Sequence, residues 1–141
     1  MEGGKKTVNE PDIQGSLYDQ IGAEKIDKLV NHFYPKVYAD PDLAPLFKGD
    51  MEEIKRKQKL FLPQFLGGPP LYSQEFGSPM MKLRHMPFKI TPKRAECWLR
   101  CMKEAFQEVG LDKHPAGEAF YERLTRVAAI MVNTENEEIE S

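Results

Sequence analysis

The residue best suited to chemistry is His85, one of three histidines in this chain of 141 residues. Apolar residues surround it between Leu83 and Phe88, and a proline follows two positions later. Such an imidazole could coordinate a metal through a neutral ring nitrogen. A lone histidine in apolar surroundings is, however, more often a hydrogen-bonded core residue, so this segment alone leaves both interpretations open.

A second unusual residue is Gln58, which falls inside an apolar helical stripe. On an ideal wheel of about 100° per residue it lies within roughly 20° of the middle of that stripe, where a core helix normally carries Leu or Ile. Its amide either bonds a neighbouring loop carbonyl or faces a cavity that holds a polar ligand. Both interpretations stand at this point.

Tyr34, Trp98 and several methionines and phenylalanines beyond the needs of the helices accompany these two residues. One object would account for all of them. A flat iron porphyrin takes a single neutral imidazole on the iron, an apolar slot around the ring, cations at its propionates and hydrogen-bond donors opposite the histidine. Because the chain lacks a Cys-x-x-Cys-His motif, we expect such a group to be held without thioether bonds, as haem b.

The elements that must position these side chains are predicted to be helices. Apolar residues recur at spacings of three and four, and no alternating run bounded by turn signals suggests a strand, so the fold class is all-α. For the second helix, Asp50 and Glu53 predict a capping box. The four predicted helices span residues 23–38, 51–66, 92–109 and 116–133.

The connection over residues 69–91 is predicted to be irregular, because prolines and Gly77 leave space only for a short helix around residues 80–84. His85 would follow the end of that helix. The segment is rich in apolar side chains, and we expect them to pack against another part of the molecule.

Composition excludes several classes of protein. Lys+Arg 20 against Asp+Glu 22 gives a net charge of -2, which argues against a dedicated nucleic-acid binder. Cys97 and Cys101 provide neither a disulfide framework nor a cysteine-rich zinc site, and we interpret them as small core residues. No apolar run approaches the roughly 20 residues that cross a bilayer. We expect a cytoplasmic protein, with His32 and His114 at its surface.

Several motifs in order resemble the truncated haemoglobins, most of all the bacterial branch called group II. The resemblance covers about residues 16–133, which we interpret as a truncated-globin domain between a flexible leader (residues 1–15) and an acidic disordered tail (residues 134–141). It implies a globin-like two-over-two helical sandwich enclosing haem. The motifs are Phe33-Tyr34, Leu46-Phe47, Lys57-Gln58-Lys59, Leu66-Gly67-Gly68-Pro69-Pro70-Leu71-Tyr72, Gly77-Ser78-Pro79-Met80, Arg84-His85-Met86-Pro87-Phe88 and Trp98.

The resemblance also implies roles for individual residues. His85 becomes the ligand of the iron, with its other ring nitrogen donating to a carbonyl. Tyr34, Gln58 and Trp98 become the donors that face the bound gas, and Ile54 stands where many haemoglobins have a polar gate. The residues assigned to cofactor binding are Phe47, Ile54, Lys57, Phe61, Tyr72, Met81, Arg84, Met86, Phe88 and Met102.

Lys57 and Arg84 are the best candidates for pairing with the haem propionates, with Tyr72 a weaker third. Lys57 has an equally good second interpretation as part of a solvated face, because other cationic residues adjoin it.

Three functions follow as hypotheses. The first is a haem protein that binds dioxygen and other diatomic gases (NO, CO) at a pentacoordinate iron in a strongly hydrogen-bonding pocket. The second is a redox enzyme, either an NO dioxygenase or a peroxidase-like protein, whose reductase would be a separate protein. The third is a cofactor-free helical interaction domain. We expect a monomer or weak homodimer.

Overall fold

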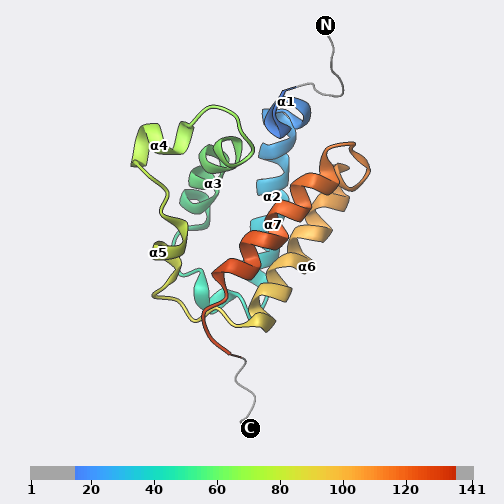
Figure 1. Cartoon of the computed structure of the whole chain (residues 1–141). Helices are drawn as coiled ribbons and strands as arrows, with labels where there is room; N and C mark the ends of the chain where they lie inside the picture. The colour runs from blue at the N-terminus through green and yellow to red at the C-terminus, as the bar shows by residue number, and fades with distance from the viewer. Residues whose placement is uncertain (1–14, 136–141) are drawn as a thin grey trace, which may run out of the picture.

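Helices make up all the regular structure in residues 15–135, the part of the chain that the computed structural model describes (Figure 1). The predicted all-α class is therefore confirmed. Most of the predicted leader and tail lies outside the described residues. Four long helices carry the fold, with bounds within two residues of those predicted: α2 (Ala23–Ala39), α3 (Met51–Phe65), α6 (Pro92–Val109) and α7 (Gly117–Met131).

Capping residues in the sequence mark both ends of helix α6. The Thr91 hydroxyl accepts a hydrogen bond from the backbone N–H of Arg94 at 3.1 Å, and Pro92 takes the first helical position. Gly110 ends the helix in the left-handed conformation, with φ of 82°. These signals place the helix that carries Trp98.

The predicted capping box of α3 is wrong. Asp50 does precede the helix, but its side chain makes no capping hydrogen bond. Glu53 instead reaches forward along the helix to Arg56, at 3.5 Å between Oε2 and Nη2. Because Asp50 is exposed, water can satisfy the first N–H groups of the helix.

Two short helices were not predicted, α1 (Leu17–Ile21) and α4 (Leu71–Phe76). A capping box starts α1, because Ser16 and Asp19 exchange backbone-to-side-chain hydrogen bonds of 3.1 and 3.2 Å. Contacts with α3 hold α4 in place. The Gln64 amide bonds both the backbone N–H and the hydroxyl of Ser73, at 3.0 and 2.8 Å.

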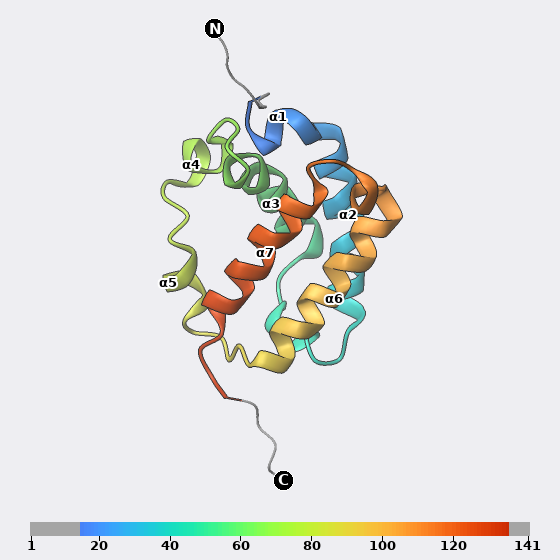
Figure 2. The same ribbon diagram turned by 45° about the vertical axis from the view of Figure 1, so that its right-hand side comes forward.

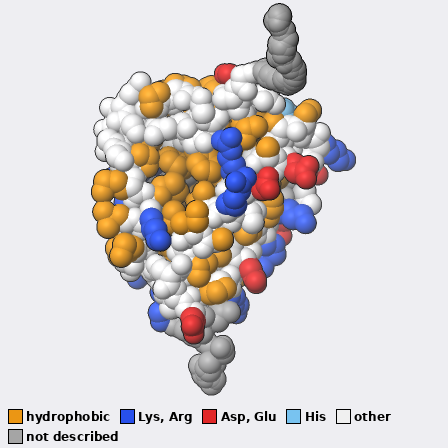
Figure 3. All heavy atoms as spheres, in the orientation of Figure 1, with side chains coloured by type: hydrophobic (Ala, Val, Ile, Leu, Met, Phe, Trp, Pro, Cys, Tyr) orange, Lys and Arg blue, Asp and Glu red, His pale blue; other side chains and the backbone are white. Residues whose placement is uncertain are grey.

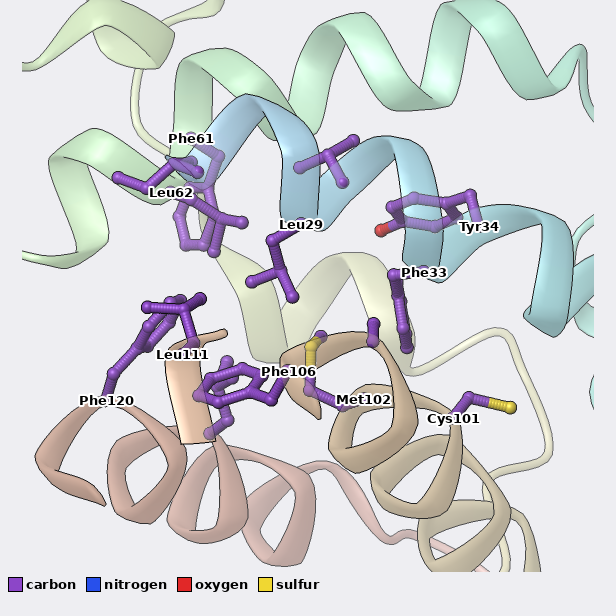
Figure 4. Packing of buried hydrophobic residues seen from close by; sticks show 14 of the residues in the cluster. Leu29, Phe33, Tyr34, Phe61, Leu62, Cys101, Met102, Phe106, Leu111 and Phe120 are labelled. Carbon is purple, nitrogen blue, oxygen red and sulfur yellow. The ribbon is translucent and has the colours of Figure 1, made fainter. Parts of the chain in front are cut away.

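The four long helices form two layers. α2 packs against α3 and against α6, and α6 packs against α7. Figure 4 shows the core between them, where side chains of α2 and α3 meet those of α6 and α7. The structure matches the predicted two-over-two sandwich. Two single-turn 3-10 helices complete it, η1 (Ala44–Leu46) and η2 (Leu111–Lys113).

Between α3 and α6 the chain runs along one side of the molecule through α4 and α5 (Met81–His85), as Figure 2 shows. The short helix is found one residue later than predicted. The expectation that its apolar neighbours would all be packed is wrong, because Met80, Leu83 and Met86 are 51%, 55% and 62% exposed. The helix is one turn long, and only Met81 and His85 on one face of it are half-buried.

No helix within residues 15–135 has the length and apolar character needed to cross a membrane. The two cysteines are buried and unpaired, as the prediction of small core residues requires. His32 is exposed, whereas His114 is half-buried and its Nδ1 accepts the backbone N–H of Ala116 at 3.0 Å. The prediction of a surface position is therefore confirmed for His32 and only partly met by His114.

Candidate functional site

A cavity of about 410 Å³ opens where α5 lies beside α7. Its volume is in the range of small-molecule sites, about 300–1,000 Å³. Figure 3 shows a hollow bordered by hydrophobic side chains on this face of the molecule. The lining residues are Tyr34, Leu43, Leu46, Phe47, Ile54, Lys57, Gln58, Phe61, Met81, Arg84, His85, Phe88, Ile90, Arg94, Ala95, Trp98, Val127, Ala128 and Met131.

Most of the side chains proposed from the sequence meet in this cavity, although they come from segments far apart in the chain. α2, α3, α5 and α6 each contribute at least one of them. Those brought together are Tyr34, Phe47, Ile54, Lys57, Gln58, Phe61, Met81, Arg84, His85, Phe88 and Trp98.

Three proposed cofactor-binding residues do not line the cavity. Tyr72 is buried behind it, with its ring edge-on to Phe61 at 5.9 Å between centroids. Met102 is a core residue, 3% exposed, and Met86, directly after α5, is 62% exposed.

His85 is half-buried, and its ring is oriented by its own helix. Its Nδ1 lies 2.6 Å from the backbone carbonyl oxygen of Met81. A carbonyl can only accept, so Nδ1 carries a proton, and in the neutral ring the lone pair is then on Nε2. A neutral imidazole with a lone pair on one nitrogen and a fixed N–H on the other is the form that ligates metals.

Tyr34 brings a hydroxyl to the cavity from α2. The residue is 6% exposed, and its ring lies edge-on to Phe33 and Phe47. Burial raises the pKa of the phenol far above its ordinary value, and the nearby Tyr38 adds to the effect. The hydroxyl therefore stays protonated. It has no hydrogen-bond partner among residues 15–135.

Gln58 and Trp98 bring further donors from α3 and α6. Both side chains are half-buried, and the Trp98 ring is fixed edge-on to Phe33 at 5.2 Å between centroids. In the described part of the chain, neither the Gln58 amide nor the Trp98 indole N–H has a hydrogen-bond partner.

Of these three donors the Tyr34 hydroxyl is buried, and an unsatisfied buried polar group loses about 1–3 kcal/mol. A ligand that accepts hydrogen bonds would repay this cost. The donor set and the imidazole thus fit an iron porphyrin with a small polar ligand. The second interpretation of Gln58, as a residue facing a cavity, agrees with its position.

Cations stand at the same cavity. Lys57 lines it, and its Nζ lies 5.5 Å from the centre of the Phe76 ring. Arg84 also lines it and is otherwise exposed, which leaves its guanidinium accessible to an anion. Either could pair with a carboxylate at the mouth.

Sequence reasoning missed Arg94, which also lines the cavity. Its guanidinium bonds two backbone carbonyls, that of Asp42 at 3.0 Å and that of Lys89 at 2.7 Å. It therefore fixes the loops at one end of the cavity. Arg94 lies one helical turn before Trp98, and this i,i+4 spacing could have identified it.

Seven apolar lining residues were also not proposed as site residues. Three of them lie on the apolar stripe of α7, whose spacing is visible in the sequence but does not distinguish a core from a cavity wall. The seven are Leu43, Leu46, Ile90, Ala95, Val127, Ala128 and Met131.

Comparisons with known proteins give consistent results. A family model described as bacterial-like globin matches residues 16–133. The group 2 truncated hemoglobin YjbI of Bacillus subtilis is 49% identical over 116 residues, which cover 82% of this chain and 87% of that protein.

Solved structures agree with the sequence comparison. The group II truncated hemoglobin from Bacillus anthracis superimposes with a TM-score of 0.82 at 48% identity, covering 86% of this chain and 98% of that one. The truncated oxygen-avid haemoglobin from Bacillus subtilis gives a TM-score of 0.81 at 48% identity, covering 84% of this chain and 100% of that one.

Proposed function

Since the chain belongs to the bacterial-like globins and is a truncated haemoglobin of the group II branch, we propose that it binds dioxygen and other diatomic gases at a haem b held by His85. One observation carries the proposal. An imidazole with a lone pair on Nε2 and three donors without a partner in the described chain line the same cavity.

The chain offers each part of a haem site. His85 supplies the neutral nitrogen for the iron, and Phe47, Phe61 and Phe88 supply flat apolar walls. Lys57 and Arg84 line the same cavity, and we propose that they pair with the propionates. When bound, the haem supplies an iron that can hold a diatomic gas. His85 is the one histidine among the lining residues, so we propose a pentacoordinate iron.

The donors determine how long a gas stays. The Tyr34 hydroxyl, the Trp98 indole and the Gln58 amide can donate to a ligand that carries partial negative charge. In a cavity with low local dielectric these hydrogen bonds are stronger than in water. We therefore propose slow release of dioxygen, which suits a scavenger or a reactive centre better than a carrier.

Dioxygen release rates test this proposal. We expect Tyr34→Phe and Trp98→Phe each to speed release by about fivefold, since a hydrogen bond contributes on the order of 1 kcal/mol. Removing all three donors would speed it by about two decades. Stopped-flow displacement of dioxygen by carbon monoxide gives the rates.

Tyr38→Phe is the matched control, because Tyr38 lies on the same helix but its hydroxyl donates to the Gly49 carbonyl at 2.9 Å. Its release rate should equal that of the wild type. Unchanged rates in both Tyr34→Phe and Trp98→Phe would show that these residues do not face the gas. The enzymatic hypotheses stay predictions, to be abandoned if turnover with nitric oxide or peroxide does not exceed that of an ordinary oxygen carrier.

A further inference from the structure

The side chain of Asn133 bonds the segment that follows His85 at three backbone groups. Its Nδ2 donates to the backbone carbonyl of Phe88 at 2.9 Å and lies 3.4 Å from the carbonyl of His85 itself. Its Oδ1 accepts the backbone N–H of Ile90 at 3.0 Å. One amide thus satisfies backbone groups on both sides of the turn after the imidazole.

The backbone strengthens the same junction. The N–H groups of Asn133 and Thr134 both donate to the carbonyl of Ile90, at 2.9 and 3.2 Å. Ile90 is thereby bonded through its N–H and its C=O, and its buried side chain lines the cavity. The chain beyond α7 is therefore joined to the segment that leads from His85 to α6.

The orientation of the Asn133 amide is determined by its partners. Oδ1 accepts from the Thr134 hydroxyl at 2.7 Å as well as from Ile90. Because the backbone N–H of Ile90 can only donate and the two carbonyls can only accept, Oδ1 must face Ile90 and Nδ2 must face the carbonyls. Asp has the same shape, but its carboxylate cannot donate to the carbonyls.

Helix α5 needs such an anchor because it is only five residues long. A helix of this length is not stable alone. Its outer face is exposed at Leu83, and its principal packing partner is α7. The hydrogen bond between His85 Nδ1 and the Met81 carbonyl orients the ring within α5, but it does not orient α5 within the molecule.

We propose that Asn133 is a positioning residue for His85: it anchors the end of α5 to the chain directly after α7 and so fixes the direction in which the imidazole meets the cofactor. This role rests on the proposed function, because it concerns the ligand of the haem. Two orienting contacts then act in series, one from Met81 to the ring and one from Asn133 to the helix.

Asn133→Asp and Asn133→Ala in the full chain test the proposal. The matched control is Asn31→Asp, which makes the same chemical change at an exposed position of α2. In the haem-free protein, hydrogen exchange should quicken at the Ile90 amide by about fivefold or more in Asn133→Ala, because its side-chain acceptor is lost.

In the haem-loaded protein, the iron–histidine stretching band in resonance Raman spectra should shift or broaden in both Asn133 variants. Transfer of haem to excess apomyoglobin should be about fivefold faster, since at least one hydrogen bond that positions its ligand is lost. Asn31→Asp should leave all three measurements as in the wild type.

The outcomes separate the two proposals. If the wild type shows no iron–histidine band, the haem assignment fails, while the exchange data still report on the anchor. If the wild type shows the band and the Asn133 variants match Asn31→Asp in band position and haem transfer, Asn133 does not position His85. A general loss of stability without a change in the band would also contradict the proposal.

Discussion

Tyr34 illustrates how burial determines the chemistry of one side chain. Packing among Phe33 and Phe47 removes its hydroxyl from water, which raises the pKa of the phenol because the phenolate would lose its hydration. The same burial leaves the hydroxyl without a partner in the described chain. Tyr34 is therefore a donor that persists into alkaline solution.

This persistence predicts how dioxygen release depends on pH. An exposed tyrosine titrates near pH 10, so a donor with an ordinary pKa would be lost there. With the pKa of Tyr34 raised, we expect the release rate to show no step at about pH 10, measured by carbon monoxide displacement. A step at that pH, absent in Tyr34→Phe, would contradict the burial of this phenol.

The raised pKa of Tyr34 also determines how the stability of the folded protein changes with pH. Above about pH 10 the unfolded chain releases the Tyr34 proton while the folded chain keeps it. The stability associated with this group is fully present below that pH and is lost as pH rises further. Tyr34→Phe should therefore be less sensitive to alkali in urea unfolding than the wild type.

Lys57 provides a test of the cations at the mouth. We expect Lys57→Gln to speed haem transfer to apomyoglobin by about two- to fivefold, because a partly exposed ion pair contributes up to about 1 kcal/mol. Lys59→Gln is the control, since Lys59 adjoins Lys57 in the chain but does not line the cavity. Equal rates in the two variants would favour the second interpretation of Lys57, as part of a solvated face.

A site residue could be predicted from the sequence where a polar side chain occupied an apolar helical stripe. Gln58 stood out because an amide occupied an apolar stripe, and the structure places it on the cavity. Arg94 gave no such conflict, because an arginine on a helix is commonly exposed. Its guanidinium bonds the carbonyls of Lys89, which is near in the chain, and of Asp42, which is distant in sequence, so its place at the cavity depends on the tertiary fold.

Among the helices, those with local start and stop signals were predicted best. Thr91, Pro92 and Gly110 mark both ends of α6 within the chain itself. Helix α4 has no side-chain cap at its start, and side chains of α3 hold it in place. These include Arg56, which bonds both carboxylate oxygens of Glu75 at 3.2 and 2.9 Å. Such tertiary contacts cannot be read from periodicity.

The start of α7 is sensitive to a single added carbon. Gly117 is buried as the first residue of this helix, and a Cβ there would overlap the backbone carbonyl of Leu111. We expect Gly117→Ala to lower the free energy of unfolding by about 1–3 kcal/mol, because backbone atoms must move to make room. Urea unfolding measures this change.

Gly49→Ala is the matched control for this substitution. Its added Cβ would lie 3.8 Å from the nearest side-chain atom, which is an ordinary contact. The stability of this variant should stay within about 0.5 kcal/mol of the wild type. If the two variants unfold at the same urea concentration, the close approach of η2 to α7 is not as described.

For the whole molecule, two helical layers enclose the core, and the cavity opens beside them against α5 and α7. The helical spacing of apolar residues was sufficient to predict the all-α fold class. The two-over-two arrangement came from resemblance to a family, because periodicity does not specify which helices pair. The place of α5 in the sequence was predicted to within one residue, but its packing beside α7 is visible only in the structure.

A cofactor that occupies the cavity must also stabilise the chain as a whole. Binding to the folded state alone shifts the unfolding equilibrium in proportion to the logarithm of ligand concentration. Part of the apolar composition of this protein lines the cavity and is buried fully only by a ligand. The haem-free protein should therefore unfold at a lower temperature than the haem-loaded protein.

The most direct test is titration of the haem-free protein with haemin, followed by absorption spectroscopy. We expect a sharp Soret band that saturates at one haemin per chain in the wild type and in His32→Ala, which alters an exposed histidine. In His85→Ala, checked for folding by circular dichroism, the band should be weak or displaced. No Soret band in the wild type, or a band that is unchanged in His85→Ala, would contradict the assignment of His85 as the haem ligand.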